Sequence, residues 1–352
     1  METFIQKIEA LDEYSMEKAE AHWLSVVKPL FSLGKLETAV IQMAGIKQTA
    51  DVCIDKKALI IMCADNGIVE EGVTQTGQEV TAAVAGNFLK GESAACIMAK
   101  RAGVDIFPVD IGMVVDVTGV TRKEEKIAYG TKNFLKEAAM TERDARKAIL
   151  LGIQKVKELK EQGYGLIATG EMGIGNTTTS SILTAVLLEK EPEQVTGKGA
   201  GLTSEGLQRK IKVIEEGIRL RKPDRENPLE VLAAFGGYDI AGLVGVFLGG
   251  AYYRVPILMD GFISAVAALL AVKLAPFCRG YILPSHISKE LGMQMLIEAL
   301  ELEIEPFLDC DMCLGEGTGA IAAIPVLDMG LQVYKQMSTF DKMSFQAYKV
   351  LE

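Results

Sequence analysis

The sequence predicts an α/β protein whose mostly parallel sheet is covered by helices on both faces, a doubly wound, Rossmann-like arrangement. Short apolar runs recur along the chain, and each ends in a polar or glycine-containing turn, as buried parallel strands do. Helical patterns alternate with these runs, which indicates right-handed crossovers between strands. With 352 residues, 49% of them apolar, the chain is long enough for one large domain and a smaller one.

The first predicted elements are a helix and a strand. Ser15 caps a helix whose apolar residues keep helical spacing until Pro29. The run 57–64 is a strand buried on both faces, and it ends at a turn that begins with Asp65. The pattern continues with a helix over 78–90, a helix over 93–101 and a strand over 104–111.

The second half of the chain repeats this alternation. Thr141 begins the clearest helix of the sequence, which ends at Gly163 and leads into a strand over 164–168. Later strands are predicted over 255–259 and 280–283, and each is followed by a polar turn and another helix.

The two ends of the chain are predicted to form the smaller domain. A helical pattern over 319–335 can pair with the N-terminal helix. We expect a large α/β substrate-binding domain over 31–300. The small helical domain would then consist of 1–30 and 301–352 and would carry the glycine-rich loop 315–319.

Charge and apolar runs exclude several classes of partner. The net charge is −10 and no dense block of Lys or Arg is present, so we expect no nucleic-acid ligand. The chain start is acidic from its second residue, unlike a signal peptide, which predicts a cytoplasmic location. The longest uncharged stretch, 240–253, is shorter than the ~20 residues that cross a bilayer, so we expect no membrane partner.

Cys310 and Cys313 form a CxxC pair, while the other cysteines are scattered. Such a pair is compatible with structural thiols, a redox pair or half a zinc site. Zinc would need two more ligands, and the only histidines are His22 and His286. We therefore favour structural thiols, then redox chemistry, and predict no metal site. His22 stands beside Trp23 in a helical pattern and is predicted to be a packing residue.

Ligands of doubly wound folds bind outside the carboxyl ends of the strands. The residues directly after each predicted strand are therefore candidates for a site, namely Asp65, Asp110, Gly170, Glu171, Asp260, Ser285 and His286. Acid–base chemistry would fall to the carboxylates, since the sequence has neither a G-x-S-x-G motif nor enough histidines for a Ser or Cys triad.

The turn 170–179 joins a predicted strand to a helix rich in hydroxyl side chains. The N–H groups of Gly175, Asn176 and Thr177 would point outward at the positive end of that helix, where a phosphate binds well. A tight turn with threonine caps explains the same residues equally well. The spacing matches neither a dinucleotide fingerprint nor a P-loop, so neither kind of site is supported.

Glu171 and Glu316 are carboxylates flanked by glycine in predicted loops. Glycine lets a backbone approach a ligand closely. A carboxylate desolvated against a ligand has a raised pKa and becomes a stronger proton acceptor near neutral pH. The alternative for each residue is a helix N-cap or a solvated loop acid.

Five segments resemble a known family. They are 65–81 (DNGIVEEGVTQTGQEVT), 170–178 (GEMGIGNTT), 259–262 (MDGF), 285–288 (SHIS) and 314–320 (LGEGTGA). Together, and in this order, they resemble the nicotinate-nucleotide–dimethylbenzimidazole phosphoribosyltransferase family. The resemblance runs from about Thr38 to about Gln336.

The resemblance implies an enzyme that moves the phosphoribosyl group of nicotinate mononucleotide onto a benzimidazole nitrogen, for the lower-ligand arm of cobalamin. It implies small-molecule substrates, a homodimer and neither cofactor nor metal, because a pyridinium leaving group carries its positive charge away. By motif, Glu316 would be the general base. The implied substrate-binding residues are Gln78, Glu171, Gly173, Gly175, Asn176, Thr177, Lys210, Asp260, Gly261, Ser288, Leu314 and Gly315.

Two residues depart from the family pattern. Asn66 stands where the family commonly has His, and Cys313 stands where an Arg often precedes the catalytic Glu, which removes a fixed cation. The segment 74–78 also lacks an aromatic residue often found there, so the accepted base could be adenine, an unsubstituted benzimidazole or a phenol. The alternatives are a subunit of a heterodimeric phenol-accepting homologue, a non-catalytic partner, or, on architecture alone, an oxidoreductase.

Overall fold

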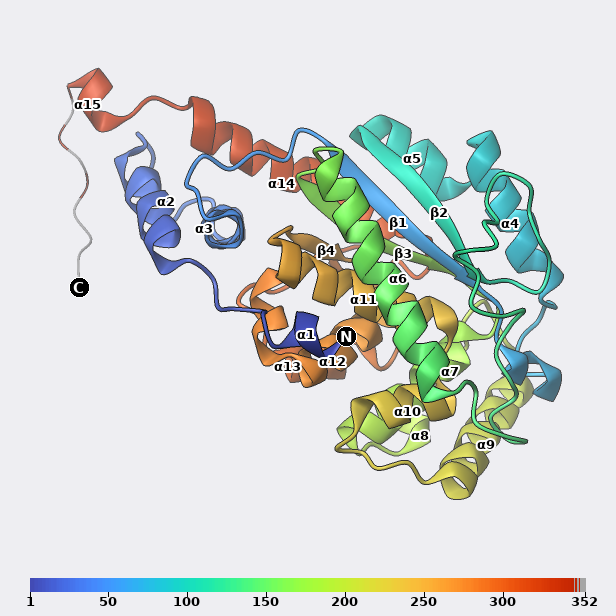
Figure 1. Ribbon diagram of the computed structural model, residues 1–352. Helices are drawn as coiled ribbons and strands as arrows, with labels where there is room; N and C mark the ends of the chain where they lie inside the picture. Colours follow the sequence, from blue (N-terminus) through green and yellow to red (C-terminus); the bar gives the residue numbers. More distant parts are fainter. Residues whose placement is uncertain (345, 347, 349–352) are drawn as a thin grey trace.

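Five parallel strands form the central sheet of the protein (Figure 1). The computed structural model describes residues 1–344, 346 and 348. The strand order is β2-β1-β3-β4-β5, with β1 (Lys57–Ala64), β2 (Val104–Gly112), β3 (Leu166–Met172), β4 (Ile257–Met259) and β5 (Ile282–Pro284). Each neighbouring pair is parallel, so the predicted α/β fold with a parallel sheet is confirmed.

Strand β1 lies between β2 and β3 and is buried along almost its whole length. Alternate residues face opposite sides of the sheet. Ile60 and Met62 belong to the hydrophobic core on one face, and Leu59 and Ile61 belong to the core on the other. An uninterrupted apolar strand is required here because both faces are covered by helices.

One hydrophobic core is built mainly from five helices packed on one face of the sheet. They are α6 (Glu142–Glu161), α7 (Asn176–Leu188), α10 (Pro228–Phe235), α11 (Tyr238–Tyr253) and α12 (Phe262–Leu274). Helices α6 and α11 touch backbone to backbone. A Cβ added to Gly152 would overlap the carbonyl oxygen of Gly242, and a Cβ added to Gly245 would overlap that of Ile149. Only glycine fits at these contacts.

The opposite core is built from α2 (Glu13–Ser25), α3 (Lys35–Lys47), α4 (Glu79–Lys90), α5 (Ala94–Ala102) and α14 (Thr318–Gln336). Trp23 packs edge-on against Tyr334, with ring centroids 5.0 Å apart. His22 packs on the same tyrosine, and its Nε2 lies 2.8 Å from the Tyr334 carbonyl oxygen. The predicted contact between the N- and C-terminal helices is therefore present, while the division into two domains stays a prediction.

The remaining described elements complete the fold. They are α1 (Glu2–Ile5), η1 (Gly67–Glu71), α8 (Pro192–Val195), α9 (Ser204–Arg221), η2 (Pro276–Tyr281), α13 (Met293–Leu300), α15 (Phe340–Met343) and a small parallel sheet of β6 (His286–Ile287) and β7 (Leu308–Asp309). Within the described residues, no helix has the length and apolar character needed to cross a membrane.

Several boundaries differ from the predictions. Asp12, not Ser15, caps α2, because its Oδ2 accepts a hydrogen bond from the Ser15 N–H at 2.9 Å. Strand β3 begins later than predicted and continues to Met172, because its pairing with β1 extends through Glu171. Part of the run 280–283 is a 3-10 helix, and β5 follows it.

We expect Gly152→Ala to lower the free energy of unfolding by about 1–3 kcal/mol, because overpacking would push α6 away from α11. Gly86→Ala in α4 is the matched control, since the nearest atom to a Cβ there, on Val117, is 4.0 Å away. This control should be neutral or slightly stabilising. Urea unfolding followed by circular dichroism measures both, and an unchanged Gly152→Ala variant would contradict the backbone contact.

Candidate active site

A cavity of about 260 Å³ lies at the carboxyl edge of the sheet. Its wall comes from the ends of β3 and β4, the first turn of α7, the β6 segment and the loop before α14. The predicted residues that line it are Glu171, Gly173, Asn176, Thr177, Asp260, Gly261, His286, Ser288, Leu314, Gly315 and Glu316. Segments far apart in the sequence thus meet at the edge where the strand ends converge.

The loop that carries Glu316 has an unusual backbone. Gly315, Glu316 and Gly317 all have positive φ angles, of 85°, 59° and 81°. Glycine adopts such angles freely, whereas glutamate adopts them at a cost. The loop packs directly on β3, since a Cβ on Gly170 would lie 2.9 Å from the Glu316 carbonyl oxygen. These glycines therefore fix the backbone from which the Glu316 side chain projects.

The Glu316 side chain is half-buried and reaches the N-terminus of α5. Its Oε2 accepts a hydrogen bond from the Ala95 N–H at 3.3 Å, at a helix end that stabilises negative charge. Burial raises the pKa of the Glu316 carboxyl, and hydrogen bonds from Ala95 and Ser93 oppose this rise. The net increase in proton affinity suits a general base.

Glu171 is a strand residue, so the prediction that it lies in a loop is wrong. Its side chain is buried and lines the cavity. Burial, and then the neighbouring carboxyl of Asp239, raises the pKa of Glu171 to about 8, although a hydrogen bond from Asn176 opposes this rise. At neutral pH the Glu171 carboxyl is therefore mostly protonated.

Asn176 joins two buried carboxyl groups. Its Nδ2 donates to Oε2 of Glu171 and to Oδ2 of Asp239, the second bond measuring 3.0 Å. Asp239 lies near the start of α11, and burial raises its pKa to about 7. Our sequence criteria missed Asp239 because no predicted strand precedes it. The two glycines immediately before Tyr238 are the signal that could have indicated it.

Asp260 follows β4 and anchors the start of α14. Its Oδ1 accepts a hydrogen bond from the Ala320 N–H at 2.9 Å. His286 lies beside it, with Nδ1 3.9 Å from Asp260 Oδ1 and 3.0 Å from the Ser285 hydroxyl. Burial raises the pKa of Asp260, while His286 and backbone N–H groups oppose the rise. This carboxyl thus ties a strand end to the helix that follows the Glu316 loop.

A buried lysine supports the first turn of α7. Lys210 Nζ donates to Thr177 Oγ1 at 3.0 Å and to the Gly197 carbonyl oxygen at 3.3 Å. Gly175 precedes the helix with a φ of 94° and is not part of the cavity wall. Burial lowers the pKa of Lys210 to about 8, and Glu290 opposes this decrease. A phosphate bound here would favour the charged lysine, so this region suits an anion.

Gln78 and Lys210 lie outside the cavity wall. Gln78 stands at the start of α4, and its Nε2 donates to the Asn66 backbone carbonyl at 3.1 Å. Lys210 lies behind the cavity wall and donates a hydrogen bond to Thr177, which is part of that wall. Their roles as substrate-binding residues stay predictions.

The two residues that depart from the family pattern have different surroundings. Cys313 lines the cavity and, like Cys310, is an exposed free thiol. Asn66 is fully buried, and its Oδ1 has no hydrogen-bond partner in the part of the chain that the structure describes. In residues 1–344, 346 and 348, no group of three or more His, Cys, Asp or Glu side chains is placed to hold a metal ion.

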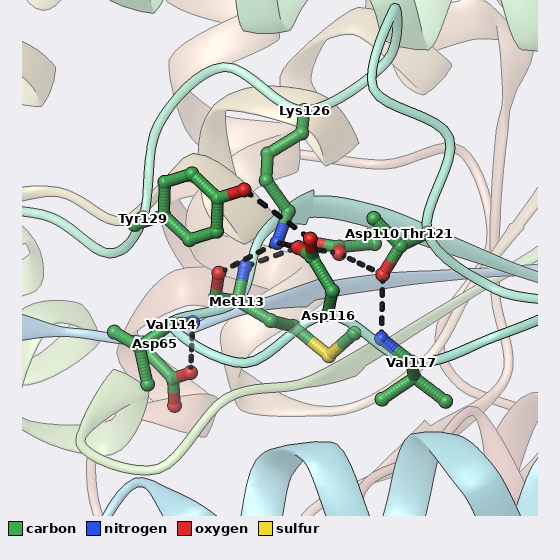
Figure 2. A network of polar contacts seen from close by, with 9 residues as sticks. All are labelled: Asp65, Asp110, Met113, Val114, Asp116, Val117, Thr121, Lys126 and Tyr129. Atoms are coloured by element: carbon green, nitrogen blue, oxygen red, sulfur yellow. Dashed lines mark hydrogen bonds and ion pairs between the residues drawn. The ribbon is translucent and has the colours of Figure 1, made fainter.

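A polar network holds the long loop after β2 at the same edge of the sheet (Figure 2). Lys126 Nζ lies 2.9 Å from the Asp110 carboxylate and 2.5 Å from that of Asp116. The Thr121 hydroxyl donates to Asp110 at 2.6 Å. Asp65 accepts a backbone N–H of the loop at 2.8 Å. The candidates Asp65 and Asp110 therefore anchor this loop and do not line the cavity.

We expect the ligand-free protein to lose stability as the pH rises from about 5 to about 8. The Glu171 carboxyl has a pKa of about 8 in the folded protein, whereas an unfolded glutamate has a pKa of ~4.3. Between these values the folded state keeps a proton that the unfolded state has released, so a rise in pH favours unfolding.

Thermal unfolding across a pH series measures this slope. Glu171→Gln should reduce it, because glutamine does not titrate. Glu305→Gln, at an exposed position, is the control and should leave it unchanged. A slope that is the same in all three proteins would contradict a neutral buried Glu171.

The chain is similar to known proteins over nearly its whole length. The sequence profile of the family described as "Phosphoribosyltransferase" matches residues 8–344. The nicotinate-nucleotide–dimethylbenzimidazole phosphoribosyltransferases of Clostridium acetobutylicum and Ruminiclostridium cellulolyticum are each 46% identical to it, over 100% of this chain and 99% of theirs. The crystal structure of CobT from Thermus thermophilus matches with a TM-score of 0.88 at 35% identity, covering 95% of this chain and 99% of that one. The profile match and the full-length identity thus show that the chain belongs to the nicotinate-nucleotide–dimethylbenzimidazole phosphoribosyltransferase family.

Proposed function

We propose that this protein transfers the phosphoribosyl group of nicotinate mononucleotide to 5,6-dimethylbenzimidazole or a related aromatic base. The products would be α-ribazole 5′-phosphate and nicotinate, and the riboside phosphate would serve assembly of the cobalamin lower ligand. The observation that supports this most is a single cavity that joins the Glu316 loop, Glu171 and the first turn of α7. Relatives of the same length that carry this name support the pair of substrates.

The reaction needs two aligned substrates and the removal of one proton. A nitrogen lone pair of the aromatic base attacks C1′ of the ribose, and the C1′–N bond to nicotinate breaks, with its electron pair passing to the pyridinium nitrogen. The proton on the second nitrogen of the base passes to the Glu316 carboxylate. Because the leaving group neutralises its own positive charge, the step needs no metal ion. Alignment in a cavity and proton removal lower the barrier together.

Different parts of the cavity wall suit different parts of the substrates. Thr177 offers N–H and hydroxyl donors for the phosphate. Lys210, which donates a hydrogen bond to Thr177, adds positive charge nearby. Asp260 and Ser288 would surround the rest of the nucleotide. Glu316, whose pKa is raised by burial, would face the N–H group of the incoming base.

The identity of the acceptor base depends on the apolar part of the wall. Val84, Phe262 and Leu314 contribute apolar surface to the cavity, which suits a flat aromatic ring. The cysteine at position 313 provides no fixed cation in the cavity wall, and the segment 74–78 contains no aromatic residue. Adenine, unsubstituted benzimidazole and phenols therefore belong in the test beside 5,6-dimethylbenzimidazole.

The assembly and the location of the protein belong to the same proposal. We infer a homodimer from the family resemblance and a cytoplasmic location from the biosynthetic role proposed above. Light scattering on the purified protein tests the first, and a monomer would contradict it.

Incubation of the purified chain with nicotinate mononucleotide and this panel of bases tests the reaction. Mass spectrometry should detect a riboside phosphate from at least one base, together with an equal amount of nicotinate. No product from any base would contradict the proposal. Activity that appears only after addition of an active homologue would instead indicate a non-catalytic or heterodimeric partner.

We expect Glu316→Gln to lower kcat by about 10²–10⁴-fold, because glutamine cannot accept the proton of the base. The fold should persist, since glutamine keeps an oxygen that can accept from the Ala95 N–H. Glu305→Gln is the matched control at an exposed site and should keep wild-type turnover. Steady-state kinetics and thermal unfolding measure both effects. Retention of most of the activity by Glu316→Gln would refute the assignment of the base.

A further inference from the structure

Asp239 is a fully buried carboxyl group that the proposed mechanism does not use. It lies near the start of α11, outside the cavity wall. We propose that Asp239 is a positioning residue for the transfer reaction, which acts through Asn176 to hold the Glu171 carboxyl against the cavity. The inference rests on the proposed function and adds to it a residue that touches neither substrate.

The connection between the two carboxyl groups is a single amide. An asparagine side chain has two N–H donors on one nitrogen. Asn176 Nδ2 donates to Oε2 of Glu171 and to Oδ2 of Asp239, so both donors are used by carboxyl oxygens. This arrangement fixes the Asn176 amide and one oxygen of Glu171. The other oxygen, Oε1, lies 2.6 Å from the place of a Cβ on Gly315, so it faces the Glu316 loop.

Packing leaves the Asp239 carboxyl in one position. A Cβ on Gly173 would lie 2.7 Å from Asp239 Oδ2, and a Cβ on Gly237 would overlap Oδ1. Oδ1 also accepts a hydrogen bond from the Ile240 N–H at 3.0 Å. The backbone therefore approaches both oxygens closely, and the carboxyl is a rigid support for Asn176.

The buried Asn66 favours a proton on Asp239. Asn66 Oδ1 lies 2.6 Å from the place of a Cβ on Gly237, so it borders the same backbone position as Asp239 Oδ1. This asparagine oxygen has no partner among the described residues. A buried acceptor without a donor is unfavourable, and a protonated Asp239 would be a donor beside Asn66 Oδ1. The geometry thus fits a neutral Asp239 beside a neutral Glu171.

Acids dominate the surroundings of this unit. The titratable groups that interact directly with Glu171 or Asp239 are Asp260, Glu316, Asp65 and Cys63. Asp110 and Lys126 act on Asp65 and so lie one step further away. Asp239, Asp260 and Glu316 raise the proton affinity of Glu171, and Asp65 raises that of Asp239. Asp239 therefore does two things for Glu171: it orients the carboxyl through Asn176 and helps to keep it protonated.

Two substitutions separate these effects. Asp239→Ala removes the support of Asn176, so we expect kcat to fall by about tenfold or more while KM for nicotinate mononucleotide changes by less than about threefold. Asp239→Asn keeps an acceptor for Asn176 and places an amide beside Asn66, and it loses only the bond from the Ile240 N–H, so it should restore kcat to within about threefold of wild type. Asp65→Asn is the control, because it removes a nearby acid that has no bond to Asn176.

The pH dependence provides a readout that general destabilisation would not move. Asp239 has a pKa of about 7 and is therefore ionised at the higher pH at which Glu171 loses its proton. Asp239→Asn removes that negative charge, so the Glu171 proton should be lost at a pH lower by about half a unit or more. Carbon-13 NMR of labelled glutamate carboxyl groups follows this titration without turnover, and Glu171→Gln assigns the signal. The Asp65→Asn protein should show a smaller change.

The outcomes distinguish this inference from the proposed function. A wild-type protein that makes no riboside phosphate would defeat the proposed function, but the NMR titration would still test the link between Asp239 and Glu171. An unchanged Glu171 titration in Asp239→Asn, or wild-type kcat in Asp239→Ala, would overturn the positioning role. If Asp239→Ala does not fold, Asp239→Asn carries the test through its titration.

Discussion

Burial of negative charge at the carboxyl edge of the sheet is the constraint on which the rest of this structure depends. Parallel strands end at one edge, and here several of them end in acids that the two helical layers then cover. An unpaired buried carboxylate is costly. The protein meets this cost in three ways: Lys126 pairs with Asp110, helix N-termini receive Asp260 and Glu316, and Glu171 holds a proton.

These three solutions separate structural acids from acids suited to chemistry. A carboxylate held by a lysine, as Asp110 is, stays charged and serves as an anchor for a loop. A carboxyl whose pKa lies near neutrality exchanges its proton easily, and a half-buried one at a cavity wall can take a proton from a ligand. Glu171 and Glu316, which border the cavity, pair with no lysine or arginine among the described residues.

The parts of this architecture that have a local cause were predictable. The strand over 57–64 was predictable because burial of both of its faces requires a continuous apolar run. The start of the helix at Thr141 was predictable because the Thr141 side chain caps that helix. The glycine neighbours of Glu171 indicated a loop, but pairing with β1 continues the strand through it. The two glycines before Tyr238 were a weak local signal for Asp239, but they do not indicate its place beside Asn176, which results from how α11 packs. Most of the residues that line the cavity were predicted from the motif resemblance. The periodicity of apolar residues predicts helices and strands, but it does not show which side chains meet at one site.

The left-handed backbone conformation of Glu316 lowers the stability of the fold at the residue that we propose as the base. A residue other than glycine held in that region costs of order 1–3 kcal/mol, and Glu316 has glycines on both sides that adopt it freely. Glycine at position 316 would relieve this strain and remove the acid in one step. Selection for robustness alone would favour that exchange, so the proposed role of Glu316 as the base supplies a reason to keep an acid at this position.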